Sequence, residues 1–174
     1  MIKDKEIVAG CRADNPMSQK LLFERYSPVV MGIAIRYLQN FADAEDLVQE
    51  TFIKIFLHIK DLRDSQQLDP WVRRIATHTI LDFLRSRSAC PEYLSLDGNT
   101  YDTADIQQTF SNHIDTEDLL KILQELPEKH RIVFNLCAID GYSYEEVSRM
   151  LNCPQATVRS CYFRAKKILS EKLQ

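Results

Sequence analysis

The sequence GYSYEEVSRMLNCPQATVRSCYFRAKKILSEKLQ, residues 141–174, predicts two helices joined by a tight turn. Ser143 is a favoured N-cap residue, and Glu146 three positions later completes a capping box. The apolar spacing of this helix is interrupted at Asn152, and Pro154 suits the first position of a second helix. This layout is typical of a helix-turn-helix, whose second helix enters the major groove of DNA.

The second of these helices has one apolar stripe and one polar, basic face. Val158, Ala165 and Leu169 belong to the stripe, together with Tyr162. Arginine can hold a guanine edge through two parallel hydrogen bonds, and Lys and Arg neutralise phosphates. An amphipathic helical hairpin with a solvated charged face is the alternative interpretation. The opposite face carries Gln155, Ala156, Arg159, Ser160, Phe163, Arg164 and Lys167.

Composition favours an all-α protein of a reducing compartment. The chain has only four glycines and no alternating strand pattern. Its five cysteines form no CxxC pair and no metal-ligand spacing, which indicates reduced thiols and no zinc site. No apolar run is long enough to cross a bilayer. We therefore expect a cytoplasmic protein with no membrane insertion and no cofactor.

The net charge of −3 conceals a strong separation of charge along the chain. Residues 71–88 are basic, whereas residues 92–126 are acidic. Residues 88–112, which overlap this acidic part, lose helical periodicity and are rich in polar and turn residues. A connection of this length favours two separately packed domains. We predict helical domains at residues 1–88 and 115–174, joined by a flexible acidic linker at residues 89–114.

Three helices are predicted before residue 40, and no chemistry is assigned to them. They cover residues 3–13, residues 17–26 with Phe23 pointing inward, and a stretch from Ser27-Pro28 to about Leu38. Ser27 is a good N-cap and Pro28 suits a first helical position, so the sequence predicts a break between the second and third helices. In the second domain, residues 116–124 predict a helix that precedes Leu126-Pro127.

Residues 40–59 predict a helix with a wide apolar face and an acidic outer face. Asp43 is the predicted N-cap. A carboxylate group of this kind can bind a divalent metal or dock a basic partner, and it can also be a plain solvated face. A metal site needs ligands from several elements, which favours docking over metal. The acidic group comprises Asp43, Glu45, Asp46, Gln49 and Glu50.

Residues 70–86 predict a basic helix capped by Asp69, after a polar loop at residues 60–68. A basic face with an aromatic residue at its start and a polar loop beside it can hold unstacked bases. A histidine such as His78 is more typical of a surface position than of a catalyst. The outer face of this helix carries Arg74, His78, Asp82 and Arg85.

Three segments together resemble one family, the bacterial sigma factors of the extracytoplasmic-function type, also called group IV. ADAEDLVQETFIKIF (42–56) is similar to the polymerase-binding helix of the family's second conserved region. PWVRRIATHTILDFLRSR (70–87) is similar to the helix that meets the minus-ten promoter element. LPEKHRIVFNL (126–136), followed by the helix pair after Gly141, is similar to the fourth region, which reads the minus-thirty-five element.

The resemblance implies a sigma2-like helical bundle, a sigma4-like helix-turn-helix domain and a function in binding rather than catalysis. Core RNA polymerase would dock its coiled-coil clamp on Asp46, Gln49 and Glu50. The minus-ten DNA would meet Arg74, His78 and Arg85, with the loop at residues 61–69 helping to hold a flipped base. An anti-sigma factor is the further partner that the resemblance implies. The minus-thirty-five DNA would meet Thr157, Arg159, Ser160, Phe163, Arg164 and Lys167.

Two functions of other classes compete with a sigma factor. A two-component output protein would share the C-terminal helix pair, but residues 1–88 lack the strand pattern and phosphoacceptor Asp of a receiver domain. A metal-dependent hydrolase could use the carboxylates from Asp43 to Glu50, but the sequence offers no second ligand set and no nucleophile.

Overall fold

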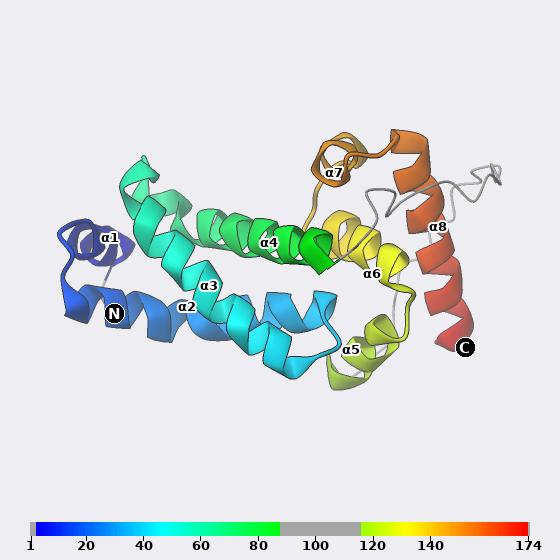
Figure 1. The fold of residues 1–174 in the computed structure, drawn as a ribbon, viewed down its shortest axis with the longest axis horizontal. Helices are drawn as coiled ribbons and strands as arrows, with labels where there is room; N and C mark the ends of the chain where they lie inside the picture. Colours follow the sequence, from blue (N-terminus) through cyan, green and yellow to red (C-terminus); the bar gives the residue numbers. More distant parts are fainter. Residues whose placement is uncertain (1–2, 88–115, 174) are drawn as a thin grey trace. The chain divides into compact units, whose positions relative to one another are not determined.

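The computed structural model describes residues 3–87 and 116–173, and every regular element in those two ranges is a helix (Figure 1). The predicted all-α fold is therefore confirmed. The chain divides into two units, Met1–Ala89 (unit 1) and Cys90–Gln174 (unit 2). The predicted linker, residues 89–114, lies outside the described residues.

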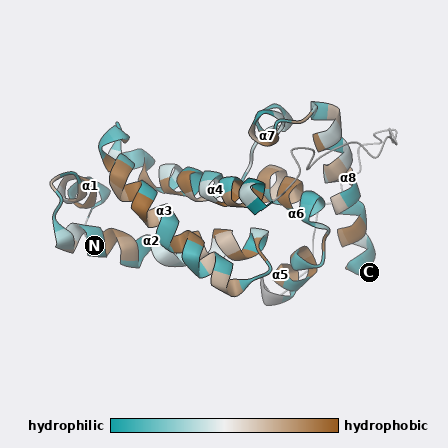
Figure 2. Ribbon diagram, viewed as in Figure 1, coloured by the Kyte–Doolittle hydropathy of each residue, from teal (hydrophilic) through white to brown (hydrophobic). Residues whose placement is uncertain are grey.

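In the described part of unit 1, α2, α3 and α4 pack against one another while α1 packs on α2. Figure 2 shows hydrophobic and hydrophilic residues in alternating bands along α3, as expected of a helix with one buried face. Two short 3₁₀ turns, Ile59–Asp61 and Ser65–Gln67, connect α3 to α4. The helices are α1 (Asp4–Arg12), α2 (Pro16–Tyr37), α3 (Phe41–His58) and α4 (Leu68–Arg87).

The predicted break at Ser27-Pro28 is wrong, because α2 continues through Pro28 as one helix of 22 residues. Proline removes one backbone hydrogen bond and crowds the carbonyl four residues earlier. Pro28 and Glu24 are both exposed, so water can satisfy that carbonyl. Buried residues on both sides of the proline, such as Leu22 and Ile33, hold the two halves on one axis.

Two predicted N-caps are displaced by a few residues. Asn40, not Asp43, caps α3, with its side chain accepting a hydrogen bond from the Ala42 N–H at 3.0 Å. Helix α4 begins at Leu68 rather than after Asp69, because the preceding 3₁₀ turn runs directly into it. Asp69 instead pairs with Arg73 across one turn, at 2.8 Å.

In the described part of unit 2, a π-helical turn, Asn135–Ile139, extends α6. Helix α8 packs against α6 and α7, and a core of Leu123, Phe134 and Leu169 lies between α5, α6 and α8. A helical unit of about 60 residues seldom exceeds about 3–5 kcal/mol of stability. The helices are α5 (Thr116–Gln124), α6 (Glu128–Phe134), α7 (Tyr144–Leu151) and α8 (Gln155–Lys172).

The predicted capping box at the start of α7 is confirmed. The Ser143 hydroxyl accepts from the Glu146 N–H at 3.3 Å, and the Glu146 carboxylate accepts from the Ser143 N–H at 2.8 Å. At the other end, Asn152 takes the left-handed conformation that stops the helix. Pro154 is the N-cap of α8 rather than its first helical residue, so the helix begins at Gln155, one residue later than predicted.

A Ser143→Ala substitution should lower the free energy of unfolding of unit 2 by about 1 kcal/mol, because the N-cap acceptor is lost. Urea denaturation followed by circular dichroism measures the change. Ser143→Thr is the matched control, since it keeps the hydroxyl and should retain most of the stability. Equal losses in both variants would contradict a capping role.

Candidate functional site

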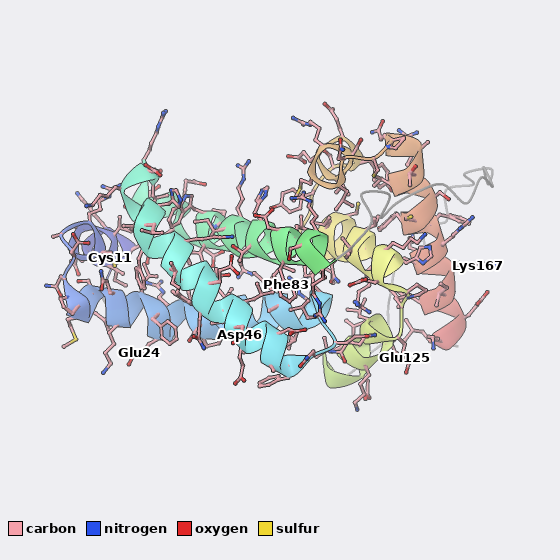
Figure 3. The ribbon with its side chains drawn as sticks, in the orientation of Figure 1. Cys11, Glu24, Asp46, Phe83, Glu125 and Lys167 are labelled. Carbon is pink, nitrogen blue, oxygen red and sulfur yellow. The ribbon has the colours of Figure 1, made fainter. Side chains whose placement is uncertain are left out.

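The outer face of α3 presents the predicted docking residues together. Asp46, Gln49 and Glu50 are all exposed and occupy adjacent turns of the helix, and Figure 3 labels Asp46 on α3. Glu50 pairs with Lys54 at 2.9 Å, and Lys54 also reaches Asp82 of α4 at 3.8 Å. These ion pairs are solvated, so a cationic partner can replace Lys54 at little cost.

The remaining acids of the predicted group, Asp43 and Glu45, lie in the preceding turn of α3. Asp43 forms an ion pair with Arg87 at the end of α4, and Glu45 is exposed. In the described ranges, no three His, Cys, Asp or Glu side chains are arranged to hold a metal ion.

Helix α4, the end of α3 and the 3₁₀ turn Ile59–Asp61 line an open pocket of about 470 Å³. Arg74 and His78, both predicted to meet DNA, contribute to its wall, together with Trp71 about one helical turn earlier. Arg85 does not line the pocket but pairs with Asp82, which does, at 2.8 Å. The lining residues are Lys54, His58, Asp61, Trp71, Arg74, Ile75, His78, Thr79 and Asp82.

His78 is half-buried in this wall and favours its neutral form. Burial lowers the pKa of His78 most, and the positive charges of Arg74 and Arg85 lower it further against the opposing effect of Asp82. A neutral imidazole has one donor and one acceptor nitrogen, and can therefore hydrogen-bond to a polar base edge.

The contribution of α3 to this pocket was not predicted from the sequence. Lys54 and His58 lie four residues apart, which places them on one side of α3, whereas Asp61 lies in the following 3₁₀ turn and starts the loop at residues 61–69 that was expected to help hold a base. The spacing predicts that Lys54 and His58 share one side of α3. It does not show that α4 packs next to that side and completes the pocket.

Helix α8 carries the second group of predicted DNA-binding residues. Arg159 and Lys167 are exposed, and Figure 3 shows Lys167 on the outer side of the helix. Ser160, Phe163 and Arg164 are partly exposed beside them. These five residues form the outer face of α8.

Thr157 does not belong to that face. It is only 7% exposed and lies on the buried side of α8 with Val158 and Cys161. Residues 157, 158, 161, 165 and 169 follow the spacing of a single helix face, so Thr157 turns toward the core. The expectation that its side chain meets DNA is therefore corrected.

Aromatic residues support the outer face of α8 from α6 and α7. The Arg159 guanidinium lies over the Tyr144 ring at 5.8 Å from its centroid. The ring centroids of Tyr144 and Tyr162 lie 5.7 Å apart. The Tyr162 ring stacks on that of Phe134, with 6.0 Å between the centroids. Cation–π contact of this kind restricts the arginine before any ligand binds.

Helix α6 adds positive charge next to Arg164. His130 is half-buried, and its pKa is lowered first by burial and then by the positive charges of Arg164 and Lys129. The sequence pattern does not connect Lys129 and His130 with α8, because they lie 35 and 34 residues from Arg164. The positive charges of Lys129 and Arg164 make this side of unit 2 attractive to anions, while His130 favours its neutral form.

The four cysteines within residues 3–87 and 116–173 belong to none of these surfaces. Cys11, Cys137, Cys153 and Cys161 are free, and burial raises the pKa of Cys137 to about 12 and that of Cys153 to about 11. Both groups therefore remain protonated thiols near neutral pH. In the described part of the chain, no helix is long and apolar enough to cross a membrane.

Comparison with known proteins gives matches in both units. The family described as "Sigma-70 region 2" matches residues 22–90, and "Sigma-70, region 4" matches residues 116–169. The "ECF RNA polymerase sigma-E factor" of Haemophilus influenzae is 30% identical over 99% of this chain and 96% of its own length. The Escherichia coli K12 protein of the same name is 29% identical over 99% of this chain and 95% of its own.

Two solved structures have a similar fold. The sigma factor RpoE of Bartonella quintana, solved with the anti-sigma factor NepR, has a TM-score of 0.55 and 26% identity over 88% of this chain and 95% of that chain. CnrH, solved with the cytosolic domain of CnrY, has a TM-score of 0.54 and 23% identity over 98% of this chain and 96% of its own.

Proposed function

The chain belongs to the extracytoplasmic-function (ECF) group of the sigma-70 family of RNA polymerase sigma factors, and we propose that its three surfaces perform the steps of transcription initiation. It is an alternative sigma factor that binds core RNA polymerase and directs promoter recognition and melting. The protein acts by binding rather than by catalysis, in the cytoplasm. The near full-length similarity to named ECF sigma factors carries this conclusion.

Docking on core polymerase uses Asp46, Gln49 and Glu50 of α3. The partner is the coiled-coil clamp of the polymerase largest subunit. The exposure of all three residues on one face, with two carboxylates, supports this assignment. A basic helical partner gains Coulomb attraction there and can displace the solvated Lys54 from Glu50.

The pocket beside α4 holds an unstacked base of the minus-ten element. Its volume of about 470 Å³ lies within the usual range for small-ligand sites. Trp71 offers a stacking surface, while Arg74 and His78 offer hydrogen bonds. Capture of the base offsets an unstacking cost of a few kcal/mol and so favours melting. Arg85 neutralises a nearby phosphate.

The outer face of α8 reads the minus-thirty-five element. Arg159, pre-ordered over Tyr144, and Arg164 supply base or phosphate contacts. Lys167 and the partly exposed Ser160 and Phe163 complete the surface. Thr157 is left out of the contact set because its side chain is buried.

The chain divides this work between two domains and has a regulatory partner. Residues 1–88 form the sigma2-like domain and residues 115–174 the sigma4-like domain, with residues 89–114 as linker. An anti-sigma factor is the proposed inhibitor. The related RpoE structure, solved with the anti-sigma factor NepR, supports this partner.

Reconstitution with purified bacterial core RNA polymerase tests the function. The chain should co-elute with the core enzyme, and the mixture should produce transcripts with defined 5′ ends from genomic DNA of the source organism. Core enzyme without the chain is the control. Binding to DNA without binding to the core enzyme would instead indicate a stand-alone regulator of transcription.

An Arg164→Ala substitution should weaken binding to the preferred promoter by about 1–3 kcal/mol and relax its sequence preference, if Arg164 makes a bidentate base contact. Affinities of holoenzyme for promoters altered in the minus-thirty-five element measure both effects. Arg149→Ala, which removes an exposed arginine of α7, is the matched control. Equal weakening on all DNA sequences would reduce Arg164 to a phosphate contact.

A further inference from the structure

The connection between α3 and α4, residues 59–67 (the α3–α4 loop), forms one side of the pocket beside α4. Asp61 lines that pocket, and its carboxylate accepts a hydrogen bond from Nδ1 of His58 at 3.0 Å. Residues 62–64 of the loop belong to no helix. Backbone groups outside regular structure need donors and acceptors from elsewhere in the protein to keep one conformation.

Arg12, the last residue of α1, supplies two such donors. Its Nε donates to the carbonyl oxygen of Ile59 at 3.4 Å, and its Nη2 donates to the carbonyl oxygen of Leu62. These two carbonyls lie on either side of Lys60 and Asp61 in the chain. Because a guanidinium holds its donors in a fixed plane, the two bonds set the direction of the loop as well as its position.

Helix α1 is itself firmly placed on unit 1. Ile7, Val8 and Cys11 are buried. A side chain at Gly10 would collide with that of Ser18, so α1 lies very close to the start of α2. The helix also packs on both 3₁₀ turns of the α3–α4 loop (Figure 1). Arg12 therefore extends from a rigid element, as the precise support of a loop requires.

We propose that Arg12 is a positioning residue for base capture, which holds the α3–α4 loop so that His58 and Asp61 keep the geometry in which the pocket accepts an unstacked base. The proposal rests on the proposed function of that pocket. Arg12 is not one of the described residues that line the pocket, so it acts through the loop alone. Groups that recognise a ligand by hydrogen bonds must lie within about 0.5 Å of the productive geometry, which a loosened loop does not provide.

A direct contact with a DNA phosphate is the competing role for Arg12, which is an exposed residue. A phosphate contact needs a positive charge, which lysine also supplies, whereas holding two carbonyls in a fixed arrangement uses the planar fork of arginine. The other polar tie between α1 and the loop is the ion pair of Asp14 and Lys60 at 3.9 Å. Both of its side chains are exposed, so this pair contributes little.

The first test measures promoter opening by holoenzyme made from the full chain and purified core RNA polymerase, with a fluorescent base analogue in the minus-ten element. Arg12→Met removes both donors, and should lower the opening rate about tenfold while leaving affinity for the core enzyme and for the closed promoter unchanged. It should also weaken the preference for one base of the minus-ten element and keep the preferences in the minus-thirty-five element. Arg12→Lys should recover only part of the rate, because it keeps the charge and loses the fork.

The matched control is Lys5→Met, which makes the same change of charge at an exposed position of the same helix and should open promoters like the wild type. All variants are compared at a temperature at which thermal unfolding shows each of them to be fully folded.

The second test needs no DNA. Trp71, the single tryptophan of the chain, lines the same pocket as His58 and Asp61. Quenching of its fluorescence by acrylamide in the free chain therefore reports how well the loop covers the pocket. Quenching should rise in Arg12→Met, rise less in Arg12→Lys and stay at the wild-type level in Lys5→Met.

The outcomes separate this proposal from the proposed function of the pocket. If Arg12→Met opens promoters like Lys5→Met while the wild type shows a base preference in the minus-ten element, the pocket stands and the positioning role is wrong. The role is also wrong if Arg12→Lys matches the wild type in both tests, because charge alone then suffices. If the wild type itself shows no base preference in the minus-ten element, the function of the pocket is wrong instead, and the quenching of Trp71 still decides whether Arg12 holds the loop.

Discussion

A Glu50→Lys variant is expected to lose binding to core RNA polymerase while keeping its helical content. Glu50 lies at the centre of the docking face, one turn from Asp46 and from Ile53. Charge reversal replaces an attraction by a repulsion against a basic partner, and changes at desolvated charge pairs cost about 2–5 kcal/mol. The expected loss of affinity is therefore at least about 30-fold. The fold loses only a solvated pair with Lys54, worth less than about 1 kcal/mol.

Gel filtration of the variant with purified core enzyme gives the qualitative answer, and titration of a labelled chain gives the affinity. Glu6→Lys is the matched control, because Glu6 is an exposed acid of α1 and the same net charge change occurs away from α3. If Glu50→Lys binds the core enzyme as tightly as Glu6→Lys does, the docking face has been assigned to the wrong residues.

The largest expected effect on stability is that of Arg131→Ala in unit 2. Arg131 is only 3% exposed, and its guanidinium donates to the carbonyl oxygens of Gln124 and Leu126 at 3.1 and 3.0 Å. It therefore ties the end of α5 to α6. Removal leaves two carbonyls without this donor and creates a cavity, at a cost of about 2–4 kcal/mol. Since unit 2 has little stability to lose, a large fraction of it should unfold.

The single tryptophan of the chain makes this prediction easy to resolve. Trp71 lies in α4 of unit 1, so its fluorescence reports that unit, whereas far-ultraviolet circular dichroism reports both. Arg131→Ala should lower the midpoint of one circular-dichroism transition and leave the tryptophan transition unchanged. Lys129→Ala removes a neighbouring charge from α6 and serves as control. If it destabilises unit 2 as much, the charge rather than the two hydrogen bonds is responsible.

The helices and their buried faces could be predicted from the sequence where the signal is local. The capping box of Ser143 and Glu146 involves four consecutive residues, and its structure follows directly from their chemistry. Helix α5 has the predicted bounds, because its apolar spacing is strong and Leu126-Pro127 follows its end closely. The grouping of Asp46, Gln49 and Glu50 on one face likewise follows from helical periodicity alone.

Other features depend on partners that the local sequence does not show. Asn40 and Asp43 are both good N-cap residues, and an Asp in the first turn is favourable too, so local chemistry does not choose between them. Pro28 carries a local breaking signal that packing on both sides overrides. The prediction that Phe23 points inward is wrong in part: its side chain is 41% exposed, because α3 covers only part of that side of α2.

In the candidate sites, too, local sequence predicts some features, while others depend on packing between helices. Arg159 and Lys167 are exposed as predicted, while Thr157 falls on the buried side, since a small rotation around α8 separates its outer face from the core. The pocket beside α4 joins residues of two helices, so no single helix-length segment of sequence contains it.

The division of α8 into two faces has a consequence for how the protein can change over evolutionary time. Val158, Ala165 and Leu169 face the core, whereas Arg159 and Lys167 face outward. Substitutions at exposed positions usually alter stability by less than about 0.5 kcal/mol. New side chains on the outer face can therefore be tried one at a time without unfolding unit 2. If the outer face of α8 reads promoter DNA as proposed, duplicated copies of such a gene are free to diverge toward different sets of target genes while keeping one scaffold.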